Sequence, residues 1–193
     1  MQINSRASYE EFAVLNFIDI KFIVPFNLIV SVFGENFEGI ENVIERLVKE
    51  GYVKEYEKSY SITELGKGRV KLIRREFVNG LTSEERQLLK NVGSILGDLS
   101  YFLQYTITKF QLKADSQKDI INSIEEVHNQ VTLALKSLLP LLPHYKMYLD
   151  RLKESLAKIK NGNTLFIVNE PNSYYYVFYE LHADIKNFVS EIE

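Results

Sequence analysis

Four basic side chains recur at helical spacing between residues 64 and 79, and they could neutralise phosphate charge. Intervals of four, three and one residues place them together on one face of a helix. These residues, here called the basic stripe, are Lys67, Lys71, Arg74 and Arg75. With Lys54 and Lys58 they could hold the backbone of a nucleic acid without reading its sequence. The open alternatives are a solvated charged surface or a face paired with the acids of another subunit.

A second set of side chains lies between Gly34 and Gly51, where a helix over about residues 37–50 would present an outward face to DNA. Arginine and asparagine can read base edges in the major groove. The base-reading candidates on this face are Asn36 and Asn42, and Arg46 nearby is a further candidate for DNA contact. Phosphates would repel the acidic residues on the same face, which are Glu38, Glu41 and Glu45. A solvated acidic helix face explains these glutamates equally well.

Patterns typical of catalysis or metal binding do not occur in the sequence. The histidines His128, His144 and His182 fall on different predicted elements and lack metal-ligand spacing. No glycine-rich phosphate loop, nucleophile elbow or zinc-protease motif is present. The absence of cysteine excludes disulfides and thiolate metal sites. We therefore expect a protein that is not an enzyme and that uses no cofactor or metal.

Composition predicts a soluble, cytoplasmic protein. The chain has 193 residues, of which 46% are hydrophobic, and this suffices for one large or two small packed domains. A formal net charge of -3 gives no overall attraction to a polyanion, so affinity for DNA must come from a local patch. The start of the chain lacks the features of a signal peptide. Residues 12–34 are apolar, but Asp19, Lys21 and Pro25 interrupt them, which favours buried helices over a membrane span.

The first helix is predicted to begin at Ser8, because Ser8 and Glu11 have the spacing of a capping box. Asn16 and Asp19 fall outside its apolar stripe. That stripe is Phe12, Leu15, Ile18 and Phe22. Pro25 fits the first turn of a second helix, since the amide that proline lacks would be unpaired there.

The next segment has the pattern of a helix, a hairpin and another helix. Gly51 should end the helix over residues 37–50 in a left-handed conformation. Strands are predicted over residues 52–56 and 59–62, which are rich in aromatic and β-branched side chains. Thr63 can cap a further helix over residues 64–79, which Gly80 would terminate.

This order of elements resembles winged-helix transcriptional regulators of the PadR and MarR type over about residues 8–80. The resemblance rests on LVKEGYV at residues 47–53, where a helix ends at glycine before a strand, and on YSITELG at residues 60–66, where the wing leads into the next helix. It implies a DNA-binding regulator whose third helix and wing enter the grooves of a duplex. It matches the pattern of the fold rather than the signature of one family.

From Leu81 onward, strand patterns give way to long helical patterns. A second helix of this part is capped near Ser116 and ends before Pro140, a third covers about residues 145–159, and a fourth follows Pro171. The first of them should pack through Leu88, Val92, Ile95, Leu99 and Phe102. Such broad apolar faces predict a helical bundle, with some faces available to a second subunit.

Tyrosines in two of these helices could line a pocket for a small apolar or aromatic effector, because they combine ring faces with hydroxyl groups. The candidates are Tyr101, Tyr105, Tyr175 and Tyr179. Packing within the bundle or between subunits is the alternative, and aromatic stripes at helical spacing more commonly serve that purpose.

Together these patterns predict a mainly α fold, with a winged helix-turn-helix domain over residues 1–80 and a helical assembly domain over residues 81–193. The predicted function is a transcriptional regulator that binds double-stranded DNA as a homodimer, without a membrane segment. The alternative is a protein-interaction module or complex subunit, in which the acidic third helix meets protein instead of DNA.

Overall fold

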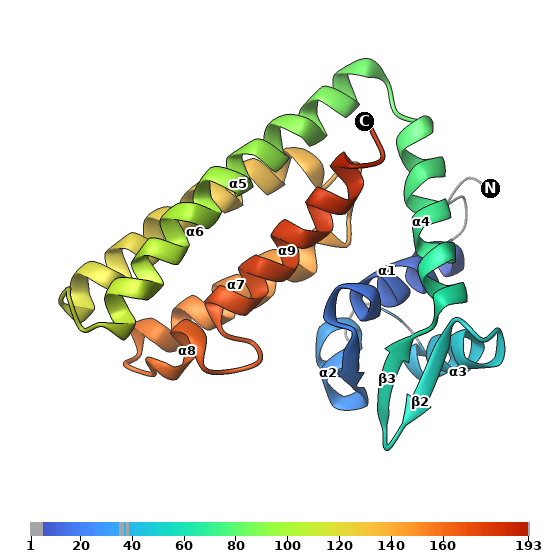
Figure 1. Cartoon of the computed structure of the whole chain (residues 1–193), viewed down its shortest axis with the longest axis horizontal. Helices are drawn as coiled ribbons and strands as arrows, with labels where there is room; N and C mark the ends of the chain where they lie inside the picture. The colour runs from blue at the N-terminus through green and yellow to red at the C-terminus, as the bar shows by residue number, and fades with distance from the viewer. Residues whose placement is uncertain (1–5, 35–36, 38, 193) are drawn as a thin grey trace. The chain divides into compact units, whose positions relative to one another are not determined.

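The computed structural model describes residues 6–34, 37 and 39–192, and this part of the chain is mainly helical with a small antiparallel sheet (Figure 1). The chain forms two compact units. The first comprises the chain up to Ser83 together with the residues from Ser190 onward, and the second comprises Glu84–Val189. Over the described ranges, no helix has both the length and the apolar character needed to cross a membrane.

The first unit combines helices with a three-stranded sheet. Its elements are α1 (Arg6–Lys21), β1 (Ile23–Pro25), α2 (Phe26–Phe33), α3 (Ile40–Lys49), β2 (Val53–Tyr56), β3 (Ser59–Ile62) and α4 (Glu64–Asn79). The strands are antiparallel in the order β1-β3-β2. The sequence predicts only the β2–β3 hairpin, because β1 is short and ends at a proline that cannot donate to a ladder. Pro25 therefore closes β1 and precedes α2 as its N-cap, instead of lying in the first turn of that helix.

Helix α1 is buried on every side along its middle. Residues 12–18 are all buried, including Asn16, whereas the sequence predicts one apolar stripe with Asn16 outside it. The helix contacts α3, α4 and β3, and these neighbours leave its middle no solvent face. The helix already includes Arg6, so Ser8 is not its N-cap. Phe22 is predicted to belong to the apolar stripe, but it follows the helix with a φ of 66° and is 69% exposed, so it is not part of the buried face.

Tight backbone turns hold α3 and the hairpin as the local sequence predicts. Gly51 has a φ of 74°. Its amide and the amide of the following residue donate hydrogen bonds to carbonyls in the last turn of α3. The hairpin turns at Glu57 and Lys58, which both have positive φ, as a two-residue turn of type I′ requires. Helix α3 itself begins at Ile40, later than predicted, after Gly39 in a left-handed conformation.

Helix α4 begins and ends where the sequence predicts. Thr63 Oγ1 accepts a hydrogen bond from the Gly66 amide at 3.0 Å and donates one to the Gly51 carbonyl at 2.7 Å. These bonds tie the start of α4 to the end of α3. A Cβ at Gly66 would lie 2.2 Å from the carbonyl oxygen of Tyr52, so only glycine fits at this crossing.

The second unit consists of helices, and most of them match the predicted patterns. They are α5 (Ser83–Gln111), α6 (Gln117–Leu138), α7 (Tyr145–Lys160), the short α8 (Leu165–Val168) and α9 (Tyr174–Val189). Ser116 caps α6 by accepting a hydrogen bond from the amide of Asp119 at 3.2 Å. Helix α7 contacts α6, α8 and α9. The apolar positions that helical spacing predicts for α6 and α7 are buried, and so are those of α9 from Tyr174 to Phe188. The last predicted position, Ile192, lies beyond the end of α9 and is half-buried.

The buried stripe of α5 differs from the predicted one. Val92 and Leu99 belong to both stripes, whereas Ile95 and Phe102 are each 40% exposed. The side chains buried in the bundle are Leu89, Val92, Leu96, Leu99, Leu103 and Ile107. Both sets have spacings of three or four residues, so periodicity alone does not distinguish them. The neighbouring helices decide which set is buried.

Polar side chains are buried between α7 and α9. Asp184 accepts a hydrogen bond from Tyr148 at 3.2 Å, and its Oδ2 lies 3.3 Å from His144 Nε2. Burial and the neighbouring Asp184 raise the pKa of Tyr148 well above its ordinary value, so its hydroxyl remains a donor. Arg151 donates to Glu180 at 2.7 Å. Removing one partner of such a buried pair is costly, because it leaves the other polar group without compensation.

Candidate nucleic-acid interface

The basic stripe of α4 has three exposed members in the structure rather than four. They are Lys67, Lys71 and Arg75. Lys67 donates a hydrogen bond to Glu64 at 2.7 Å, which raises the pKa of Lys67 and keeps it cationic. Arg75 donates to Glu191 of the same unit at 3.2 Å. Lys71 makes no ion pair with another described residue, so its charge is available to a partner.

Arg74 does not belong to this exposed surface, which corrects the predicted stripe. It is 6% exposed and donates to Asn16 Oδ1 from Nε at 3.0 Å and to Asp19 Oδ2 from Nη2 at 3.0 Å. One helical position corresponds to a rotation of about 100°, and this turns Arg74 toward α1 while Arg75 points to solvent. The charge of Arg74 is therefore neutralised inside the unit and is not available to a phosphate.

The hairpin next to α4 carries two exposed lysines. Lys54 lies on β2, and Lys58 lies at the turn. Their neighbours Glu55 and Glu57 are also exposed. Successive side chains of a strand point to opposite faces, so Lys54 and Glu55 lie on opposite faces of the sheet. One face of the hairpin can therefore present a positive charge although the hairpin as a whole carries both signs.

The outward face of α3 is acidic. Glu41, Asn42 and Glu45 are exposed. Arg46 donates to Glu11 at 2.7 Å, which occupies its guanidinium within the unit. Of the two described residues of α3 that are predicted to contact DNA, Asn42 is therefore the one that is exposed and not held by an ion pair. The remaining predicted residues of this face lie outside the described residues and are Asn36 and Glu38.

The histidines lie on separate elements of the second unit, and no group of potential ligands within the described residues could hold a metal ion. His144 is buried beside Asp184. Burial lowers the pKa of His128, and the nearby Lys160 lowers it further. Burial, followed by the charge of Lys186, also lowers the pKa of His182. Both imidazoles are therefore neutral near pH 7.

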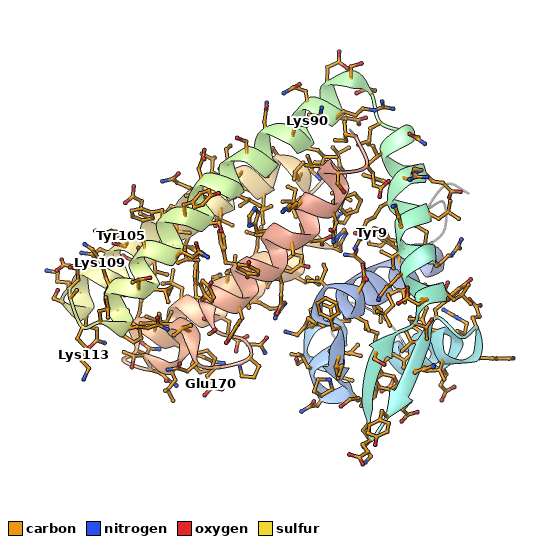
Figure 2. The ribbon with its side chains drawn as sticks, viewed as in Figure 1. Tyr9, Lys90, Tyr105, Lys109, Lys113 and Glu170 are labelled. Atoms are coloured by element: carbon orange, nitrogen blue, oxygen red, sulfur yellow. The ribbon has the colours of Figure 1, made fainter. Side chains whose placement is uncertain are left out.

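Two of the four tyrosines predicted to form an effector pocket meet at a groove. The groove lies between α5 and α9, has a volume of about 460 Å³, and is lined in part by Tyr101 and Tyr179. Tyr105 lies elsewhere on α5, with Lys109 Nζ 4.7 Å from its ring centroid (Figure 2). The ring of Tyr175 lies 5.9 Å from that of Tyr179 but does not line the groove.

Sequence reasoning misses the residues that hold Arg74 and the floor of the groove. Asn16 and Asp19 are polar residues three positions apart in the otherwise apolar stretch 12–20 of α1, and this pattern is the available signal of a buried partner. Gly93 and Gly97 lie in the middle of a long helix, where glycine is unfavourable and indicates close packing or open space. Neither signal reveals which distant element comes near.

No protein-family model, curated protein or solved structure matches the chain. The fold and its surfaces therefore define the structural class of the protein. It is a mainly helical protein of two units, whose first unit carries exposed cations on a helix and an adjoining hairpin.

Proposed function

We propose that the protein is a transcriptional regulator and that its first unit binds double-stranded DNA as a winged helix. The observation that carries the proposal is the set of exposed lysines on α4 and the adjoining hairpin, which are Lys54, Lys58, Lys67 and Lys71. Thr63 joins the two elements and is held by hydrogen bonds to Gly51 and Gly66. Cations on such a rigid frame can position a phosphate backbone.

Contact with DNA in this proposal is chiefly contact with phosphates. The acidic outward face of α3, with Glu41 and Glu45, would be repelled by the backbone. Asn42 could still hydrogen-bond an adenine edge. Affinity should therefore fall steeply with salt and differ little between duplex sequences.

The second unit would hold two copies together and bind a small effector. A homodimer presents two cationic surfaces to one duplex, which raises the apparent affinity without any new contact. The α5–α9 groove is the place at which an effector would bind.

Fluorescence anisotropy of a labelled duplex tests the role of α4. Lys67→Ala combined with Lys71→Ala should weaken binding to any duplex and make the plot of log affinity against log salt shallower by about 1 for each phosphate that is no longer neutralised. Arg74 stays unchanged, because it is buried in the core of the unit. The matched control is Lys146→Ala, which removes an exposed lysine of α7.

Lys54→Ala combined with Lys58→Ala tests the hairpin in the same way. If either double variant showed the same salt dependence as the parent protein, the element that carries its substitutions would not contact DNA. If the parent chain bound no duplex even at low salt, DNA binding by this unit would be wrong.

The acidic face of α3 favours a second candidate function, a protein-interaction module. Glu41 and Glu45 are exposed on this face and complement a basic partner surface. Charge reversal by Glu41→Lys with Glu45→Lys separates the two functions. It should strengthen duplex binding if α3 faces DNA, and it should leave duplex binding negligible if α3 serves only protein partners.

A further inference from the structure

The groove between α5 and α9 has a cationic part and an aromatic part. Lys90 and Lys186 line one part, and Tyr101 and Tyr179 line the other. Figure 2 shows Lys90, which lines the groove, and Tyr105, which follows the last lining residue of α5, toward opposite ends of that helix. A ligand that fills the groove therefore meets positive charge at one end and ring faces at the other.

The dimensions of the groove favour a ligand longer than a single ring. Lining residues on α5 extend from Lys90 to Gln104, which at 1.5 Å per residue is about 21 Å. On α9, Tyr179 and Lys186 are separated by about 10 Å on the same measure. The volume of about 460 Å³ is that of a site for a small organic ligand.

The charge of the groove favours an anion. No aspartate or glutamate is among the described residues that line it, although the whole chain has a net charge of -3. His182 lies in the same lining, and burial together with Lys186 lowers its pKa. Lys90 and Lys186 thus form a local positive site that a negatively charged ligand would neutralise.

The floor of the groove contains a glycine that internal packing does not require. A Cβ at Gly93 would lie 3.0 Å from Val189 Cγ2, so close packing accounts for that glycine. A Cβ at Gly97 would meet no atom within 4 Å. Glycine disfavours the helix relative to alanine. The space above Gly97 is therefore room that the fold leaves open for other atoms.

From these features we propose that the groove, which is the effector site of the proposed function, binds a phosphorylated ligand with a planar ring, of the size of a nucleoside diphosphate. The phosphates lie by Lys90 and Lys186, and the ring lies against Tyr101 and Tyr179. The amide of Gln104 offers both a donor and an acceptor to the edge of the ring. The hydroxyl, amide and amino groups of the lining do not suit a purely apolar ligand.

Isothermal titration calorimetry of the full chain with ADP tests the site. The parent protein should bind ADP, and Lys186→Ala should weaken binding about tenfold, the effect typical of one charge-assisted hydrogen bond. Gly97→Leu should abolish binding, because its side chain fills the floor. Gly68→Leu on α4 is the matched control, since a Cβ there also meets no atom within 4 Å. Thermal unfolding of both leucine variants should occur no lower than in the parent, which shows that they are folded.

Pyrophosphate and adenosine separate the two parts of the groove. Each should bind more weakly than ADP by about tenfold or more. Equal binding of pyrophosphate would overturn the ring contact, and equal binding of adenosine would overturn the cationic contact. Failure to bind ADP, or unchanged ADP binding by Gly97→Leu, would overturn the site. The measurement contains no DNA, so it stands apart from the duplex experiments.

Discussion

Arg74 and Arg75 are neighbours in the sequence but meet different environments. Arg74 is buried against Asn16 and Asp19, whereas the side chain of Arg75 is 58% exposed and pairs with Glu191. A buried charge depends on its partners for solvation, while an exposed one is solvated by water. The same residue type is therefore part of the core at one position and makes an exposed ion pair at the next.

We expect Arg74→Ala to lower the free energy of unfolding by about 3 kcal/mol, because it deprives Asp19 of its cation and Asn16 of its donor. Arg75→Ala should change it by about 1 kcal/mol or less. Urea denaturation followed by circular dichroism measures both variants. If both variants lowered the free energy of unfolding by the same small amount, Arg74 would not be the buried member of the pair.

His128 should make stability depend on pH. Burial lowers the pKa of His128, the charges of Lys160 and Lys153 lower it further, and Glu125 opposes them. Its Nδ1 is buried, with no hydrogen-bond partner among the described residues. The unfolded chain therefore binds this proton more readily than the folded chain does.

The stabilisation linked to His128 is complete above the ordinary histidine pKa of 6.5 and is lost as the pH falls through that value toward the lowered one. His182 acts in the same direction. Thermal unfolding at about pH 7.5 and about pH 5.5 should show a lower midpoint at the acidic pH. The difference should be smaller in His128→Gln, and an undiminished difference would assign the effect to other groups.

At the scale of the element, α4 contains two glycines with opposite roles. Gly66 crosses the carbonyl of Tyr52 too closely for any Cβ, while Gly68 faces open space. The first glycine permits the helix to approach the end of α3. The second only weakens the helix, since glycine has poor helix propensity.

Alanine substitutions separate these roles within one helix. Gly66→Ala should lower the free energy of unfolding by about 2 kcal/mol or more, because the clash moves the backbone. Gly68→Ala should raise it by about 0.5–1 kcal/mol through helix propensity. Urea midpoints of the two variants should therefore shift in opposite directions, and a shift in the same direction would contradict the close approach at Gly66.

At the scale of the whole molecule, the proposed homodimer needs an apolar face. Ile95 and Phe102 lie seven residues apart on α5 and are each 40% exposed. At about 100° per residue, they lie on the other side of the buried stripe from Gly97 and the groove. Dimerisation through this face would leave the groove accessible to a ligand.

Ile95→Glu combined with Phe102→Glu should shift the mass measured by light scattering from dimer toward monomer, because carboxylates do not pack in an apolar interface. Leu165→Glu is the control, since Leu165 is an exposed apolar residue of α8. If the double variant kept the mass of a dimer, the interface would lie elsewhere on the protein.

Local sequence determined most of the secondary structure. Thr63 and Ser116 cap helices, and Gly51 ends one, because each acts through hydrogen bonds to residues close by in the chain. The predicted stripes of α6 and α7, and that of α9 as far as Phe188, are buried for a similar reason, since helical spacing alone gathers their apolar side chains. The exposed acids of α3 and the lysines of the hairpin also follow from local patterns.

Contacts between distant segments select which face of each helix is buried. The stripe of α5 could follow either of two registers, and Asn16 on α1 became buried because Arg74 of a distant helix reaches it. The short strand β1 exists only through its pairing with β3. The groove at Gly97 likewise depends on α9. Contacts between distant segments determine these features, so hydrophobic periodicity and capping cannot reveal them.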